Sequence, residues 1–265
     1  MVCAGSCKCI CMKISRPQRT DLIRKDAAVE LSLRLEALLA VIDPHSVLAD
    51  IGTDHAFLPI ELIRRGVCRK VIACDVGAGP LQRAADHVKE AGLCDQIETR
   101  LADGLLGLCP GEADAVVIAG MGGALMASIL EKAEGMGILE HLDQLVLQPQ
   151  SEFEKVREAM LHLGFTAVKE RMVEDRGKFY WIISSVRNID PKLAVTTTQE
   201  KPWAARYGTL LPGSKDPVFL SYMERQIRKT EMLLQELEGK EGEAASSRRN
   251  ELMKTLQDLN EIFTM

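Results

Sequence analysis

Acidic residues and glycines recur where the apolar segments of the first half of the chain end. Asp50 and Gly52 close the segment 47–51, Asp75 closes 71–76, and Asp103 and Gly104 follow 97–102. If these segments are parallel strands, their carboxyl ends meet at one edge of a sheet. Asp75 can there accept hydrogen bonds from both hydroxyls of a ribose, and Asp103 can meet an adenine amino group. The pattern predicts an adenosine ligand, although each residue alone also fits a helix cap or turn.

The turn after Gly52 distinguishes two adenosine cofactors. NAD sites usually have several glycines, which let a helix N-terminus approach the pyrophosphate. Here only Gly52 is present, and Asp54 would repel a phosphate. Asp50 and Asp54 instead suit the ammonium and sulfonium of S-adenosylmethionine, and a NAD-dependent oxidoreductase is disfavoured. His55 lies in the same turn, where a single histidine is more often a structural hydrogen-bonding residue than a base.

The next two predicted strands, 115–119 and 145–148, end in residues that suit a flat base. Gly120, Met121, Gly122 and Gly123 follow the first of them and would let a base approach the backbone closely. The alternative is a glycine-rich turn that packs under the following helix. Gln148 can hydrogen-bond a base edge.

The Asp/Asn-Pro-Pro-aromatic box of enzymes that methylate exocyclic amines is absent from the sequence. A ring nitrogen with its own lone pair needs less help, and its methylation gives a cation. A nearby carboxylate would stabilise this cation, and Asp54 is the candidate.

A regular alternation of strands and helices must position these residues. Helices are expected at 80–91, from 124 and at 152–163, between and after the strands, which predicts a parallel sheet covered on both faces. Residues 166–173 and 179–186 are rich in strand formers with no helix between them, so an antiparallel hairpin is expected. An α/β sheet that ends in such a hairpin is typical of the class I Rossmann-like methyltransferase fold.

Four segments are expected along the chain. Residues 1–25 form a basic tail, solvated or a nucleic-acid arm, with Met12 a possible true start. Residues 26–190 form the S-adenosylmethionine-binding domain, and 191–215 form a linker. Residues 216–265 form a helical hairpin of coiled-coil type, since their apolar residues follow heptad spacing, with Thr230 at one seam position.

Composition limits the class of protein. The 265 residues carry a net charge of −5, and no apolar run approaches the roughly 18 residues of a membrane span, so a soluble cytoplasmic protein without membrane contact is expected. Four cysteines crowd the first eleven residues, but no metal site is expected there. Cys68, Cys74, Cys94 and Cys109 are predicted to be small buried hydrophobic residues in a reducing compartment.

Six segments together resemble the bacterial tRNA (adenine-22-N1)-methyltransferase family. They are ADIGTDHAFLP at 49–59, DVGAGP at 75–80, ADGL at 102–105, VIAGMGG at 117–123, LVLQPQ at 145–150 and KFYWII at 178–183. The resemblance implies an enzyme that uses S-adenosylmethionine to methylate N1 of adenine 22 in the D-arm of tRNA, with a C-terminal coiled coil that helps to hold the tRNA. It implies cofactor roles for Asp50, Gly52, Asp54, His55, Asp75, Asp103, Gly104 and Ala119, and acceptor-side roles for Gly120, Met121, Gly122, Gly123, Gln148 and Pro149.

An adenine inside folded tRNA must be extruded before its N1 can react, and phosphate contacts must supply that energy. The candidate cations are Lys155, Arg157, Lys169, Arg171, Arg176, Lys178, Arg225, Arg228 and Lys229. Each is also compatible with ordinary solvated surface. The alternative functions are methylation of another RNA or a small molecule, and a non-catalytic adapter that binds RNA or protein. A monomer is favoured.

Overall fold

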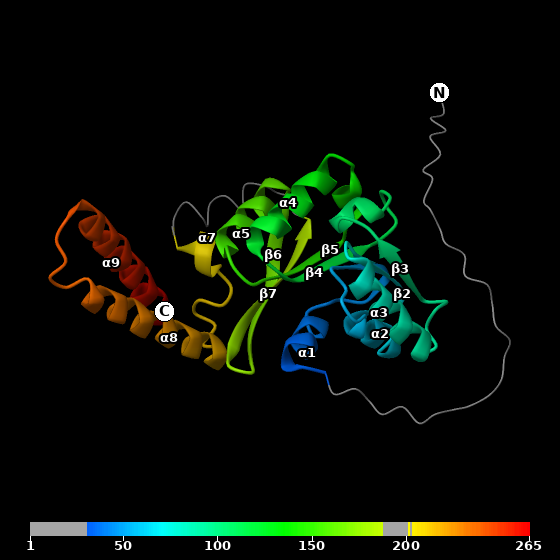
Figure 1. Ribbon diagram of the computed structural model, residues 1–265, viewed down its shortest axis with the longest axis horizontal. Helices are drawn as coiled ribbons and strands as arrows, with labels where there is room; N and C mark the ends of the chain where they lie inside the picture. Colours follow the sequence, from blue (N-terminus) through cyan, green and yellow to red (C-terminus); the bar gives the residue numbers. More distant parts are fainter. Residues whose placement is uncertain (1–30, 188–200, 202) are drawn as a thin grey trace. The chain divides into compact units, whose positions relative to one another are not determined.

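A seven-stranded mixed sheet forms the centre of the computed structural model, which describes residues 31–187, 201 and 203–265 (Figure 1). The strand order is β3-β2-β1-β4-β5-β7-β6. The strands are β1 (His45–Ile51), β2 (Cys68–Asp75), β3 (Ile97–Leu101), β4 (Ala115–Met121), β5 (Gln144–Pro149), β6 (Phe165–Asp175) and β7 (Lys178–Arg187). The first five pair in parallel, whereas β7 is antiparallel to both β5 and β6. This confirms the predicted Rossmann-like α/β fold with its terminal hairpin.

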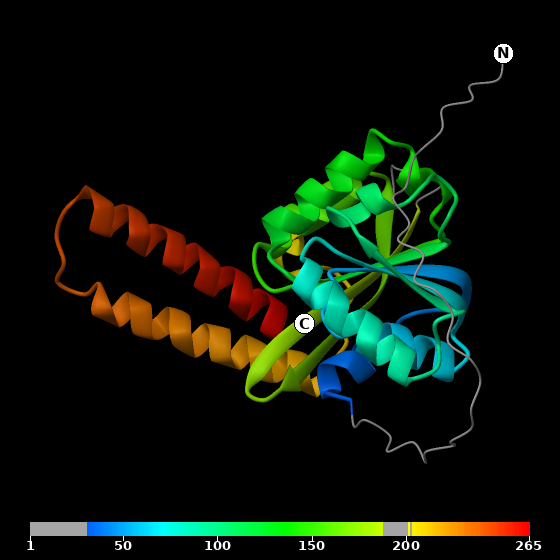
Figure 2. The ribbon, with the colours of Figure 1, turned by 45° about the vertical axis from the view of Figure 1, so that its right-hand side comes forward.

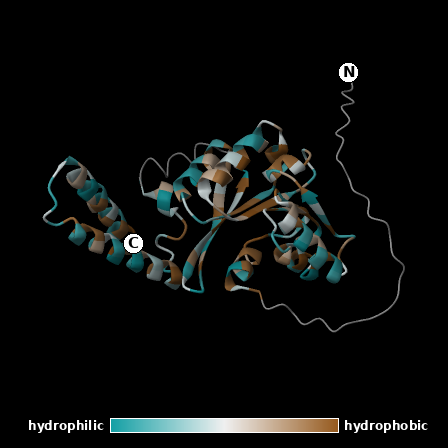
Figure 3. Cartoon of the chain, viewed as in Figure 1, coloured by the Kyte–Doolittle hydropathy of each residue, from teal (hydrophilic) through white to brown (hydrophobic). Residues whose placement is uncertain are grey.

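Helices cover both faces of this sheet because successive strand residues point to opposite sides (Figure 2). Leu48 of β1 packs in a core with α1 (Leu33–Leu39), α2 (Phe57–Arg64) and α3 (Ala78–Glu90). Its neighbour Ala49 packs in a second core with α4 (Gly123–Glu134) and α5 (Phe153–His162). Two short 3₁₀ helices, η1 (Gly104–Gly107) and η2 (Ile138–His141), border the second core. The central strands are largely hydrophobic in Figure 3, as expected for strands buried on both faces.

Two long helices, α8 (Pro217–Glu236) and α9 (Glu243–Phe263), form an antiparallel hairpin at the C-terminus (Figure 2). The side chain of Asp216 caps α8 by accepting from the backbone N–H of Phe219, and Pro217 occupies the first helical position. Thr230 is buried as predicted, and its hydroxyl donates to the backbone oxygen of Gln226. The helical hairpin agrees with the expectation from heptad spacing, whereas its supercoiling as a coiled coil stays a prediction.

Aromatic side chains join α8 to the β6–β7 hairpin. Trp181 of β7 meets Phe219 and Tyr222 of α8 edge-on, with ring centroids 5.9 Å and 6.4 Å away. Trp203 and Tyr207, at the start and end of α7 (Ala204–Tyr207), are buried in the same core. This part of the segment 191–215 is therefore packed rather than linker-like, because its aromatic residues fill the space beside α5.

The structure corrects the prediction for two cysteines, and other predictions concern residues that it does not describe. Cys68 and Cys74 are buried as predicted. Cys94 and Cys109 are exposed, because Cys94 lies in the turn after α3 and Cys109 in the connection after η1. The expectations for 1–25, including the cysteine cluster and the start at Met12, concern residues outside those described. Across 31–187, 201 and 203–265, no helix is long and apolar enough to cross a membrane, and no group of side chains could hold a metal ion.

Candidate active site

The turn after β1 is shaped by Gly52. Its φ is +83°, a conformation that L side chains rarely adopt, and its N–H donates to the backbone oxygen of Cys74 over 2.8 Å. The N–H of Thr53 donates to the same oxygen over 3.0 Å. A Cβ on residue 52 would lie 2.2 Å from Cε of Met121. The turn therefore requires glycine for its backbone and keeps Met121 of β4 directly above it.

Asp50 is a buried carboxylate at the carboxyl edge of the sheet. It pairs in register with Ala73 of β2 and Val117 of β4, and only 6% of its surface is exposed. Burial raises the pKa of Asp50 from 3.8 to about 6, opposed by Thr53 and Arg34 and assisted by the charge of Asp75. A charge that is costly to bury and is not neutralised by a close partner is typical of a functional site.

Asp75 and Asp103 lie where the sequence predicts them. Oδ1 of Asp75 accepts from the N–H of Gly77 over 2.7 Å, and no described residue donates to Oδ2. Gly77 is the N-cap of α3, so the chain bends tightly around this carboxylate. Asp103 precedes η1 and is exposed, with Lys132 3.1 Å from its Oδ2. Gly104 has a φ of +60° and packs against Ile129.

Asp54 differs from its predicted role, and His55 lies beside it. The Asp54 carboxylate is exposed and forms an ion pair with Arg83 of α3, so its charge already has a cationic partner. The rings of His55, Phe57 and His87 form a cluster in which each pair of ring centroids is 5.3 Å apart, and the backbone oxygen of His55 is 2.9 Å from Nδ1 of His87. The His55 ring is held by stacking rather than by hydrogen bonds of its Nδ1, so its cofactor role stays a prediction, and Asp54 is poorly placed to stabilise a second cation.

The glycine-rich turn after β4 contains two kinds of glycine. Gly120 has a φ of +80° and sits in an irregularity of the β4–β5 register, and a Cβ there would lie 3.1 Å from a guanidinium nitrogen of Arg34. The backbone of residue 120 therefore requires glycine, and the approach of a base to it stays a prediction. A Cβ on Gly123 would instead lie 2.4 Å from the backbone oxygen of Glu152. Gly123 is required for packing between the starts of α4 and α5, so for this residue the alternative reading is correct.

Arg34 is the site residue that sequence patterns did not reveal. It lies on α1, and its guanidinium donates to Oε1 of the fully buried Gln148 over 2.8 Å. The same guanidinium lies 5.6 Å from the ring centre of Tyr180 on β7. Its backbone N–H donates to Asp175, which ties α1 to the hairpin. The available signal was a single cation inside an apolar helical segment, which gave no reason to place it beside Gln148.

Gln148 and Pro149 end β5 beside the β4 turn. The amide nitrogen of Gln148 donates to the backbone oxygen of Pro149 over 3.2 Å, and Met121 is in register with Pro149. The backbone N–H of Gln150 donates to the oxygen of Met121. Ala119, Met121 and Gln148 thus lie together at the same edge as Asp50 and Gly52, as predicted.

Among the candidate phosphate cations, Arg157 is a wrong prediction. It is 8% exposed, forms a buried ion pair with Glu170 and lies over the Trp181 ring, because its position on α5 faces the core. Lys155 and Lys169 pair with Glu152 and Asp43 at the surface. The other six candidates on the hairpin and α8 are exposed, namely Arg171, Arg176, Lys178, Arg225, Arg228 and Lys229.

Comparisons with known proteins agree with this geometry. The family model described as a methyltransferase domain matches residues 31–183. A tRNA (adenine(22)-N(1))-methyltransferase of Bacillus subtilis is 32% identical over 236 residues, covering 89% of this chain and 96% of the relative.

Solved structures extend the similarity over the C-terminal helices. One is the crystal structure of Streptococcus pneumoniae Sp1610, which is described as a putative tRNA (m1A22) methyltransferase. It is 33% identical to this chain, with a TM-score of 0.76. It covers 88% of this chain and 99% of its own. The same Streptococcus protein in complex with S-adenosyl-L-methionine is 32% identical with a TM-score of 0.74, and covers the same shares of the two chains.

Proposed function

The chain belongs to the tRNA (adenine(22)-N(1))-methyltransferase family, and we propose that the edge formed by β1, β2, β4 and β5 is the site where it methylates adenine 22 of tRNA. The observation that carries this assignment is the meeting of Asp50, Gly52 and Gln148 where the strand order reverses between β1 and β4. In open α/β sheets, ligands bind at this point, beyond the carboxyl ends of the strands.

The residues of the first three strands suit S-adenosylmethionine. Gly52 leaves the turn without a side chain, so the methionine portion can approach the backbone of the β1 turn when the flexible Met121 side chain moves aside. Asp75 has Oδ2 available for the ribose hydroxyls, since Gly77 uses only Oδ1. Asp103 and Gly104 border the adenine side, and Ala119 borders the floor of the site.

S-adenosylmethionine supplies a methyl group on sulfur, which the lone pair of adenine N1 takes as the carbon–sulfur bond breaks, leaving S-adenosylhomocysteine and a positively charged base. Asp50 is the carboxylate that stabilises positive charge on both sides of this transfer, in place of the predicted Asp54. Above its pKa of about 6, Asp50 is ionised in a poorly solvated position, where its charge acts strongly on a nearby cation.

The acceptor side is held by Gly120, Met121, Gly122, Gln148 and Pro149. Gly120 and Gly122 present backbone to the flat base, and Met121 adapts its flexible side chain between base and cofactor. Arg34 positions Gln148, because its guanidinium donates to Oε1 and fixes the plane of the amide at the end of β5. Arg34 is thus a positioning residue.

The proposed substrate bears on the localisation of the enzyme, and the C-terminal helices bear on its oligomeric state. A tRNA substrate favours action in the cytoplasm. The apolar residues Met223, Leu252 and Leu259 of α8 and α9 are buried within one chain, which favours a monomer.

The experiment is methyl transfer from labelled S-adenosylmethionine to an unmodified tRNA transcript, followed by nucleoside analysis. We expect 1-methyladenosine at position 22 and no product with a transcript that carries guanosine there. Asp75→Ala should weaken S-adenosylmethionine binding by about tenfold or more, because two hydrogen bonds to the ribose are lost. Absence of product with every unmodified tRNA, or equal product with the guanosine transcript, would contradict the assignment.

A further inference from the structure

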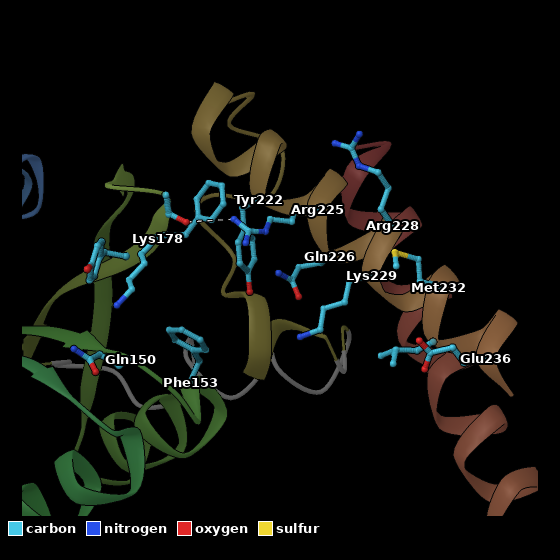
Figure 4. A pocket seen from close by; sticks show the side chains of 14 residues that line it. Gln150, Phe153, Lys178, Tyr222, Arg225, Gln226, Arg228, Lys229, Met232 and Glu236 are labelled. Carbon is cyan, nitrogen blue, oxygen red and sulfur yellow. Dashed lines mark hydrogen bonds between the residues drawn. The ribbon is translucent and has the colours of Figure 1, made fainter.

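A cleft lies between the tip of the β6–β7 hairpin and one face of α8 (Figure 4). We call it the hairpin–helix cleft. One wall consists of Gln150, Phe153 and residues 177–180, and the other of α8 residues from Tyr222 to Glu236. Its volume of about 820 Å³ falls within the range of roughly 300–1,000 Å³ of small-molecule pockets, so it has room for a nucleotide.

The α8 wall is one continuous stripe of the helix. Tyr222, Arg225, Gln226, Lys229 and Leu233 line the cleft at spacings of three and four residues, which places them on one face. The stripe combines aromatic, cationic and amide side chains, and Arg225 and Lys229 on it are exposed.

The charge of the cleft is strongly positive. Four cations line it, Lys178, Arg225, Arg228 and Lys229, against a single acid, Glu236. Arg228 pairs with Glu224, and Arg225 donates to the backbone oxygen of Gly177. Lys178 and Lys229 form no ion pair with any residue in the described part of the chain, and both are exposed. Figure 4 shows Lys229 reaching from α8 toward the hairpin wall.

Aromatic rings are interleaved with these cations. Phe153, Phe179, Tyr180 and Tyr222 line the cleft, and each is only half-buried. Phe179 and Tyr222 meet edge-on, with ring centroids 5.4 Å apart and planes at 67°, so they do not cover each other face to face. The guanidinium of Arg225 lies over the Phe179 ring, 5.8 Å from its centre. Cations beside accessible rings are the combination that binds unpaired nucleotides, because bases stack on the rings and phosphates meet the cations.

The cleft continues into the proposed acceptor site. Gln150 lines the cleft, and its backbone N–H donates to Met121, while its side-chain nitrogen lies 3.7 Å from a Cβ built on Gly120. Tyr180 also lines the cleft, and Arg34 lies over its ring. A strand of RNA with its target base at Gly120 therefore meets the hairpin–helix cleft within a short distance.

We propose that the hairpin–helix cleft binds an unpaired nucleotide that adjoins the target adenine, with its base on Tyr222 and its phosphates on Lys178 and Lys229. This inference rests on the proposed function, since it takes the RNA from the same acceptor site. It identifies what holds the extruded segment: the aromatic surface replaces the stacking that the neighbouring base loses when the adenine leaves the fold of the tRNA.

The first test concerns the phosphates. The double variant Lys178→Ala/Lys229→Ala should bind the tRNA transcript about tenfold more weakly, measured by fluorescence anisotropy. The slope of log Kd against log salt should fall by about 1.4, since each single-strand phosphate contact contributes roughly 0.7. Lys89→Ala on α3 removes an exposed lysine away from the cleft and is the matched control. Unchanged affinity and slope in the double variant would overturn the inference.

The second test concerns the stacked base. Transcripts with 2-aminopurine at position 21 or 23 should lose fluorescence when they bind the wild-type protein, because stacking quenches this base. Tyr222→Leu should abolish the quenching and weaken binding about fivefold or more, whereas Tyr222→Phe, which keeps a ring, should retain both. Phe263→Leu on α9 is the matched aromatic control.

Thermal unfolding of each variant separates folding from binding, because Tyr222 also packs against Trp181. Equal behaviour of the Leu and Phe variants at position 222, both folded, would overturn the role of the ring. S-adenosylmethionine binding by calorimetry and product formation by the wild-type protein, measured in parallel, test the proposed function separately.

Discussion

Two buried charged sites lie on opposite faces of the sheet, and they are built in opposite ways. On one face, Asp50 is buried and forms no ion pair with any described residue, and burial raises its pKa to about 6. On the other, Arg157 of α5 and Glu170 of β6 neutralise each other, with Trp181 beneath the guanidinium. The first site opens on the edge where ligands bind, whereas the second is closed by the segment at Gly208.

The closed site leaves no space for a ligand. Gly208 has a φ of +65°, and a Cβ there would lie 2.5 Å from a Glu170 oxygen and 2.6 Å from an Arg157 nitrogen. The residue after α7 must therefore be glycine if the chain is to cover the ion pair. The comparison indicates that a buried charge without an ionic partner belongs to a functional site, whereas a buried charge with a covered partner has a structural role.

The largest expected effect comes from breaking the closed pair. Arg157→Met leaves Glu170 buried without a partner and should lower the free energy of unfolding by about 3–5 kcal/mol. Urea denaturation measures this change. The double variant Arg157→Met/Glu170→Leu should recover most of the loss, because no uncompensated charge remains.

Lys155→Ala, which removes the exposed pair with Glu152, is the control and should leave the urea midpoint of unfolding unchanged. If Arg157→Met unfolds at the wild-type urea concentration, the ion pair is not structural and the comparison between the two sites fails.

Asp50→Asn should instead raise the free energy of unfolding. The pKa of Asp50 is higher in the folded protein, about 6, than its ordinary 3.8, so ionisation opposes folding as the pH rises through this window. The asparagine variant should be more stable than the wild type by about 3 kcal/mol above pH 7, and equal to it below pH 4. Urea denaturation at pH 8 and at pH 4 measures the difference.

The same variant should lose affinity for S-adenosylmethionine, and wild-type affinity should fall as the pH drops below about 6, where Asp50 takes up a proton. Calorimetry across pH 5–8 checks this dependence. A stability difference that is the same at pH 4 and pH 8 would show that the Asp50 charge does not oppose folding.

The smallest effect is expected from Arg34→Lys. Lysine keeps the charge near Asp50 but cannot hold the Gln148 amide and lie flat over Tyr180 at once. We expect kcat to fall about tenfold, while the Kd for S-adenosylmethionine stays within about twofold of the wild type. Arg69→Lys, at an exposed position in β2, is the control. A change in cofactor affinity with kcat unaltered would place Arg34 in the cofactor site instead.

Local patterns were sufficient for most of the fold and for part of the site. The strand-helix alternation gave the sheet, and residues 166–186 gave the terminal hairpin, because hydrophobic periodicity and turn residues act over short distances. Asp75 and Gly52 were predictable because one follows a strand and the other makes the turn. Cys94 and Cys109 were wrongly predicted to be buried, since a single cysteine carries no local signal of burial.

Residues that act through distant partners could not be predicted in this way. Arg34 meets Gln148 across 114 positions of sequence, and Arg157 meets Glu170 only because α5 packs on the hairpin. Asp54 was a reasonable candidate for a cation-stabilising carboxylate until α3 brought Arg83 beside it.

The sequence by itself determined which strands carry acidic residues and glycines at their ends, because strand periodicity and turn chemistry depend on neighbouring residues. Only the tertiary structure decided which of these charges are compensated, because Arg83 and Lys132, which pair with Asp54 and Asp103, come from other elements. It also decided that the aromatic and cationic stripe of α8 faces the hairpin tip, since the direction of a helix face depends on what the helix packs against.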